Sequence, residues 1–89
     1  MEANTWHSLG SAYLGLADHR QAVDCFQRVL GLAADRGDPF NEASALASLG
    51  DVYHEQGDRT SARQSWAAAR RIFDEISHAD GDKVRAKLR

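Results

Sequence analysis

The chain has 89 residues, of which 43% are hydrophobic and 27% charged, and its net charge is −2. This composition excludes a disordered chain and is sufficient for one small domain, which we place over residues 1–89. So small a charge does not favour nucleic acid as a partner, and no apolar run reaches the roughly 20 residues needed to cross a membrane. The single cysteine, Cys25, cannot form an intrachain disulfide and favours a cytoplasmic location.

The first two predicted elements are helices over about residues 2–16 and 18–37. In the first helix, apolar residues recur at i, i+3 and i+7: Trp6, Leu9 and Tyr13. Asp18 is typical of an N-cap and Gly37 of a C-terminal cap, so these residues bound the second helix. Its expected buried face holds Ala22, Phe26, Val29 and Leu30, with Leu32 and Ala33 further along.

Two more helices come next, then a short terminal one. Asp38 and Pro39 predict the start of the third helix, because proline at the first helical position loses no hydrogen bond. Gly57 ends this helix and Asp58 caps the fourth. The third helix repeats the spacing of the first in Leu46, Leu49 and Tyr53. The fourth is expected to bury Ala62, Trp66, Ala69, Ile72, Phe73 and Ile76. A helix over about residues 80–89 is expected to cover this surface with Val84 and Leu88.

The two helix pairs are related by a period of 40 residues. The repeated segments are Leu9-Gly10-x-x-Tyr13 with Leu49-Gly50-x-x-Tyr53, and Asp18-x-x-x-Ala22-x-x-x-Phe26 with Asp58-x-x-x-Ala62-x-x-x-Trp66. Such a period is typical of stacked helical repeats. Gly10 and Gly50 stand inside helices, where glycine costs about 1 kcal/mol relative to alanine. We therefore expect a partner helix to approach closely there, through Ala22 and Ala62, with the aromatic residues around the crossing.

These units resemble the tetratricopeptide repeat over residues 2–77. The matching residues are Trp6, Leu9, Gly10, Tyr13, Ala22 and Phe26, then Leu46, Leu49, Gly50, Tyr53, Ala62, Trp66 and Ala69. Three features depart from the family pattern. Val29 stands where the family usually has alanine, and Ala34 and Asp74 stand where it has a helix-ending proline. The period of 40 residues also exceeds the family's common value of about 34. The resemblance implies an all-α solenoid of two repeats, about residues 2–37 and 38–77, that acts as a non-enzymatic protein–protein interaction module without cofactors.

A narrower resemblance concerns the second unit and the C-terminal segment. The segments Gly57-Asp58-x-x-x-Ala62-x-x-x-Trp66, Ile72-Phe73-Asp74-Glu75-Ile76 and 82–89 are similar to the C-terminal repeat arrays of large bacterial regulators. Those regulators include transcription activators and signal-transduction NTPases. The resemblance implies either a fragment of such a regulator or a free-standing two-unit adaptor.

In the tetratricopeptide family the first helix of each pair lines a concave, partner-binding surface. Helical spacing predicts that this groove is lined mainly by small polar residues: Asn4, His7, Ser8, Ser11, Leu14, Ser44, Ala47, Ser48, Asp51, His54 and Glu55. Some family members hold a C-terminal carboxylate there with lysines and asparagines. His7, Ser11, Ala47 and Asp51 stand near those positions, so we do not expect that clamp. The alternative is a solvated groove that binds no partner.

Other chemistry finds little support in the sequence. Cys25 and the four histidines lack the close ligand pairs of a zinc site, and no catalytic arrangement stands out. The basic residues of segment 83–89 surround their predicted helix instead of forming a stripe that could track a phosphate backbone. Because two units leave the N-terminal pair without a cap, the alternative function is an oligomerisation element that self-associates through this pair.

Overall fold

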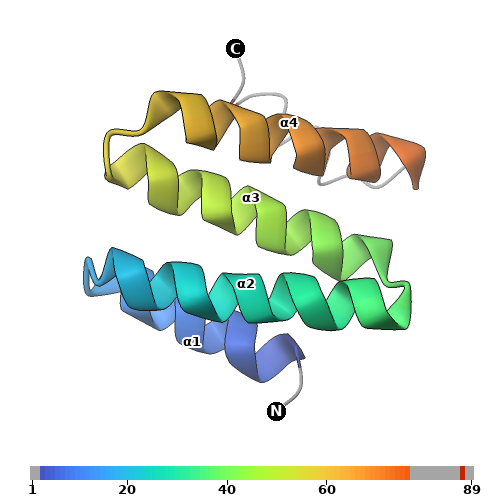
Figure 1. The fold of residues 1–89 in the computed structure, drawn as a ribbon, viewed down its shortest axis with the longest axis horizontal. Helices are drawn as coiled ribbons and strands as arrows, with labels where there is room; N and C mark the ends of the chain where they lie inside the picture. Colours follow the sequence, from blue (N-terminus) through green and yellow to red (C-terminus); the bar gives the residue numbers. More distant parts are fainter. Residues whose placement is uncertain (1–2, 77–86, 88–89) are drawn as a thin grey trace.

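The computed structural model describes residues 3–76 and Lys87, with side chains from Thr5 onward. These residues form four helices: α1 (Ala3–Gly15), α2 (His19–Arg36), α3 (Pro39–Glu55) and α4 (Arg59–Glu75). Helices α1 and α2 make one antiparallel pair and α3 and α4 the next, stacked side by side (Figure 1). No strand occurs in this described part of the chain, which confirms the predicted all-α fold. The predicted helix over residues 80–89, with Val84 and Leu88, lies outside the described residues, Lys87 excepted.

Three aspartates begin the helices after α1. The side chains of Asp18, Asp38 and Asp58 each accept a hydrogen bond from the backbone N–H three residues further on, at 3.3, 3.1 and 3.0 Å respectively. Each bond satisfies one of the N–H groups that a helix start leaves without an intrahelical partner. Hydrogen bonds from the backbone and side chain of Ser61 lower the pKa of the Asp58 carboxyl. The predicted caps of all three helices are confirmed.

The turns inside the two pairs share a left-handed residue but differ in its identity. Gly57 comes after α3 with a φ of 81°, a conformation that glycine adopts freely. Its equivalent 40 residues earlier is Ala17, with a φ of 59°. An L-residue with a side chain pays about 1–2 kcal/mol for this conformation. The first turn is therefore strained at the position where the second is relaxed.

Each helix pair is closed by an aromatic ring lying on a glycine. A Cβ atom added to Gly10 would stand 2.8 Å from Cε1 of Phe26, and one added to Gly50 would overlap the indole of Trp66. Both rings are buried, and each crosses from the second helix of its pair to the first. The expected close approach is confirmed. The rings themselves, rather than Ala22 and Ala62, supply the atoms nearest to the glycines.

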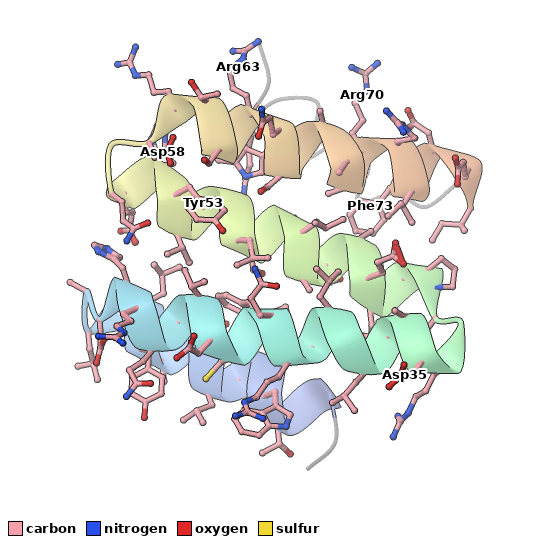
Figure 2. The ribbon with its side chains drawn as sticks, in the orientation of Figure 1. Asp35, Tyr53, Asp58, Arg63, Arg70 and Phe73 are labelled. Carbon is pink, nitrogen blue, oxygen red and sulfur yellow. The ribbon has the colours of Figure 1, made fainter. Side chains whose placement is uncertain are left out.

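In the part of the chain that the structure describes, the core has three clusters of buried residues. Between α2 and α3 it contains Ala22, Phe26, Leu49 and Val52, beside Val29 and Ala45. Between α3 and α4 it contains Ala43, Ala62, Trp66, Ala69 and Phe73. Figure 2 shows Phe73 turned toward α3 while Arg63 and Arg70 project from the other side of α4. The expected burial of Ile76 is wrong: this residue is the C-cap just past the end of α4 and is 36% exposed.

Two glycine-to-alanine substitutions test the ring contact. Gly50→Ala is expected to lower the free energy of unfolding by about 1–3 kcal/mol, because the new methyl group must displace the buried Trp66 indole. Gly31→Ala is the matched control, since Gly31 lies inside α2 with no atom within 4 Å of the added Cβ. It should raise the free energy of unfolding by about 1 kcal/mol through helix propensity alone. Urea unfolding monitored by circular dichroism measures both. Equal effects of the two substitutions would contradict the contact.

Candidate peptide-binding surfaces

The predicted groove residues on α1 differ in how much of each side chain is exposed to solvent. Ser8 and Ser11 are exposed. His7 is half-buried, with its ring edge-on to Phe26 at 5.3 Å between centroids. Leu14 is also half-buried, because it packs against the core between α2 and α3. Part of its apolar surface is therefore covered by the protein itself. The side chain of Asn4 lies outside the described part of the structure. The two serines are the α1 side chains best placed to contact a partner.

On α3, the predicted groove residues meet α4 and α2. Ser44 and Ser48 are half-buried. The indole Nε1–H of Trp66 lies 3.2 Å from both the Ala47 carbonyl oxygen and Oδ1 of Asp51, and donates to both. Asp51 also accepts a 2.6 Å hydrogen bond from Nζ of Lys87. These contacts hold the Asp51 carboxylate in place on α3, the helix that also carries Ser44 and Ser48.

The last turn of α3 carries two further predicted groove residues. His54 is exposed, with its ring 5.6 Å from that of Trp66. Glu55 points instead to the preceding pair, where its Oε2 lies 3.8 Å from Nε2 of His19 at the start of α2. The structure thus divides the predicted set: the contacts of Glu55 lie at the junction between the pairs, whereas His54 borders a separate pocket.

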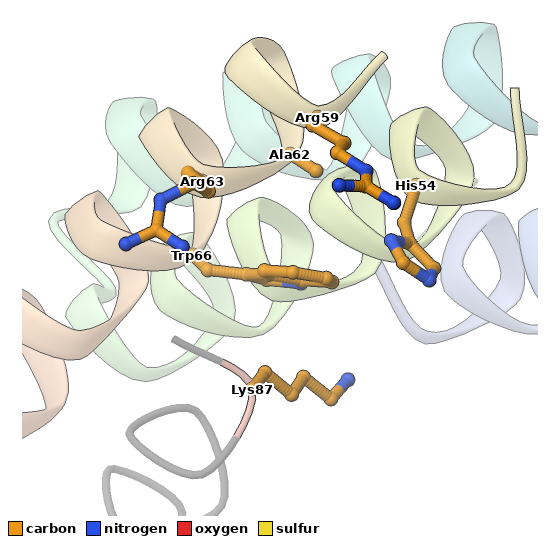
Figure 3. A pocket seen from close by; sticks show the side chains of 6 residues that line it. All are labelled: His54, Arg59, Ala62, Arg63, Trp66 and Lys87. Atoms are coloured by element: carbon orange, nitrogen blue, oxygen red, sulfur yellow. The ribbon is translucent and has the colours of Figure 1, made fainter. Parts of the chain in front are cut away.

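That pocket, of about 230 Å³, lies where α3 ends and α4 begins. Its lining residues are His54, Arg59, Ala62, Arg63, Trp66 and Lys87 (Figure 3). Nζ of Lys87 stands 5.7 Å from the Trp66 ring centroid, within range of a cation–π interaction. Of these residues the sequence predicts only His54 to bind, because the others lie on α4 or at position 87, outside the first-helix face where the groove is expected. The available signal was the i, i+4 spacing of Arg59 and Arg63 on the helix that carries Trp66.

Cys25 is not part of either surface. It is 4% exposed, and burial and the neighbouring Asp24 raise the pKa of its thiol. A protonated, buried thiol is a poor nucleophile and packs as a small apolar group. Among the described residues, no group of three or more His, Cys, Asp or Glu side chains could hold a metal ion.

Comparison with known proteins decides the family. A tetratricopeptide repeat family model matches residues 1–77. The chain belongs to the tetratricopeptide repeat family. Such repeats are protein-interaction scaffolds and are typically non-catalytic. None of the helices described for this tetratricopeptide repeat protein is long and apolar enough to span a membrane.

One curated relative is the 43 kDa receptor-associated protein of the synapse from Gallus gallus, 37% identical over 46 residues. The match covers 52% of this tetratricopeptide repeat chain and 11% of the relative. The chain therefore spans a small part of that relative's length. No solved structure matches the chain.

The half-buried His7 predicts a pH dependence of folding. Burial lowers its pKa from 6.5, so the unfolded chain binds a proton more readily than the folded one. Stability is therefore greatest above the unfolded pKa and declines as the pH falls from about 7 toward the lower folded pKa. His7→Phe keeps a ring beside Phe26 but cannot titrate. Its unfolding midpoint in urea should fall less between pH 7.5 and 5.5 than that of the parent. Because both proteins keep the other three histidines, parallel pH profiles would exclude a contribution from His7.

Proposed function

We propose that this protein binds a peptide or protein partner along the side formed by α1 and α3. The observation that carries the proposal is the family match over residues 1–77, together with two helix pairs stacked as repeats. The proposed contacts are Asn4, His7, Ser8, Ser11, Leu14, Ser44, Ser48, Asp51, His54 and Glu55. The Gallus gallus relative is named for its association with a receptor, and this supports a protein as the partner.

Within this set, the exposed Ser8 and Ser11 are the best positions for blocking the surface. They share the outer side of α1, and neither belongs to a core cluster of the described residues. A long charged side chain at either position would occupy the space of a bound peptide without disturbing the packing. Gln27 and Gln64, which are exposed on α2 and α4, allow the same change elsewhere.

The test is a selection of peptides from a phage-displayed library on the immobilised protein. Peptides that bind the parent should bind the Ser8→Arg/Ser11→Arg variant at least about ten-fold more weakly in fluorescence anisotropy, a loss of about 1.4 kcal/mol. The Gln27→Arg/Gln64→Arg variant adds the same charge and should bind as the parent does. Failure to enrich any peptide, or equal binding by both variants, would contradict the proposed groove.

We further propose that the chain is part of a larger cytoplasmic bacterial regulator. The support is the resemblance of segments 57–66 and 72–76 to the repeat arrays of such regulators. The buried, protonated Cys25 is compatible with a reducing compartment. The coding sequence on either side of these 89 residues tests this proposal, because an upstream NTPase or DNA-binding segment would support it and its absence in the complete gene would refute it.

A second candidate function is self-association through the first helix pair. It is favoured by Leu16, which is 75% exposed in the turn between α1 and α2, and by the half-buried Trp6 on the same pair. Exposed apolar side chains of this size gain free energy when a second copy covers them. The partner in this case is a second copy of the same chain.

Light scattering coupled to size exclusion tests self-association. The parent is expected to have the mass of a dimer at high micromolar concentration, and Leu16→Glu is expected to be monomeric because a buried carboxylate opposes the interface. Ala67→Glu, on the exposed face of α4, carries the same charge and should leave the dimer intact. A monomeric parent at that concentration would rule the interface out.

A further inference from the structure

The two repeats differ on the helix face that receives the next helix. On α2 the residues of this face that change character in the second repeat are His19, Val23 and Leu30, here called the α2 ridge. Ala22 and Phe26 also meet α3, and their equivalents Ala62 and Trp66 remain apolar. Val23 and Leu30 pack against the core cluster that includes Leu49 and Val52 of α3. The α2 ridge is therefore an apolar surface with one basic residue at its start, and α3 covers it.

Forty residues later the same face of α4 is lined by arginines. The equivalents of His19, Val23 and Leu30 are Arg59, Arg63 and Arg70, here called the α4 ridge. They stand at i, i+4 and i+11, which places them on one side of the helix, and Figure 2 shows Arg63 and Arg70 projecting from α4 away from α3. Leu14, which packs against the α2–α3 core, is likewise replaced by the exposed His54. A helix as apolar as α3 would therefore meet a much more polar surface on the second repeat.

The charges of the α4 ridge are incompletely balanced. Arg70 pairs with Asp74 at 3.6 Å, but among the described residues no ion pair is formed by Arg59 or Arg63. Like charges at i, i+4 repel each other, and cations in the first turns of a helix oppose its dipole. Lys87 also lines this pocket but is already paired with Asp51 at 2.6 Å, so the charges there that lack an ion pair among the described residues are those of Arg59 and Arg63. This pocket favours an anion.

The first repeat indicates where that anion comes from. At the α2–α3 junction, the residue that opens α2 (His19) meets a carboxylate from the last turn of the incoming helix (Glu55), at 3.8 Å. Arg59 is the equivalent of His19, opens α4 and has an exposed side chain. Suppose that a partner helix docks on α4 in the way that α3 docks on α2. Its last turn would then lie at Arg59. Its side chains equivalent to Leu49 and Val52 would face His54 and Arg63.

We propose that the α4 ridge and its pocket bind an acidic helix of a partner protein, with carboxylates on Arg59 and Arg63. Guanidinium groups bind carboxylates through paired hydrogen bonds, which makes arginine well suited to this recognition. The two surfaces share His54, which lines the pocket and is also a proposed groove contact, whereas the arginines lie on α4 and the exposed groove serines on α1. The proposal rests on the proposed function only in that the ligand is a polypeptide. Loss of groove binding in the Ser8→Arg/Ser11→Arg variant would leave binding at the α4 ridge unaffected.

The probe is a peptide with the sequence of α3, residues 39–55, carrying Leu49→Glu and Val52→Glu and retaining Glu55. A control peptide has glutamine at all three positions. Binding is monitored by NMR through the indole Nε1–H of Trp66, a residue that lines the pocket and donates to Ala47 and Asp51. The glutamate peptide should shift this resonance and bind at least about ten-fold more tightly than the glutamine peptide, with an affinity that falls as salt is added.

Matched variants of the protein locate the site. Arg59→Gln/Arg63→Gln should weaken the glutamate peptide at least about ten-fold, whereas Arg59→Lys/Arg63→Lys should weaken it less. Arg20→Gln/Arg36→Gln removes the same charge from exposed positions on α2 and should bind as the parent does. The proposal is overturned if both glutamine variants weaken binding equally, if the two peptides bind alike, or if millimolar peptide leaves the Trp66 resonance unmoved. It is also overturned if acetate at equal carboxylate concentration produces the same shift, since the pocket would then bind small anions generally.

Discussion

The structure depends on the contact between a glycine of one helix and a buried aromatic ring of the next. Phe26 lies on Gly10 and so joins α2 to α1, and the same ring belongs to the core cluster that α3 completes. Trp66 lies on Gly50 in the same way and is further held by its hydrogen bonds to α3. Each ring thus fixes the distance inside its pair. In the first pair it also forms the surface on which the second pair rests, so a methyl group at the glycine would disturb both contacts.

Much of this architecture could be predicted because its signals are local. Aspartate caps, helix-ending glycines and apolar spacing lie within a few residues of one another, and the structure confirms all four helices. The strained Ala17 could not be recognised from its own identity, since alanine favours right-handed helix; only its relation to Gly57 through the repeat reveals it. The error at Ile76 has a similar origin, because the apolar pattern continues one residue past the last turn that the helix forms.

The candidate binding surfaces were less predictable because they depend on contacts between helices. Helical spacing placed Leu14 on the groove side, but the neighbouring pair reaches far enough to include it in the core. Glu55 shows the same effect, since its partner His19 lies 36 positions away in the sequence. The pocket beside Trp66 joins residues of α3, α4 and position 87, and no local motif links them. The 40-residue correspondence between the two repeats carries information that local motifs lack. A helix face that is covered in the first repeat has an equivalent face in the second, and the residues on the two faces can be compared.

A polar outer face on a helical repeat can have a simpler explanation, since a face that no further repeat covers must be polar to avoid aggregation. Mixed charges would meet that need, and they would stabilise the helix through i, i+4 pairs, as Arg70 and Asp74 do. Arg59 and Arg63 do the opposite: they place two like charges in the first turns of α4, where the helix dipole disfavours them. Since solubility alone does not require this arrangement, the α4 ridge is better explained by an anionic partner. In this respect the second repeat keeps the geometry of the first but selects a neighbour of different chemistry.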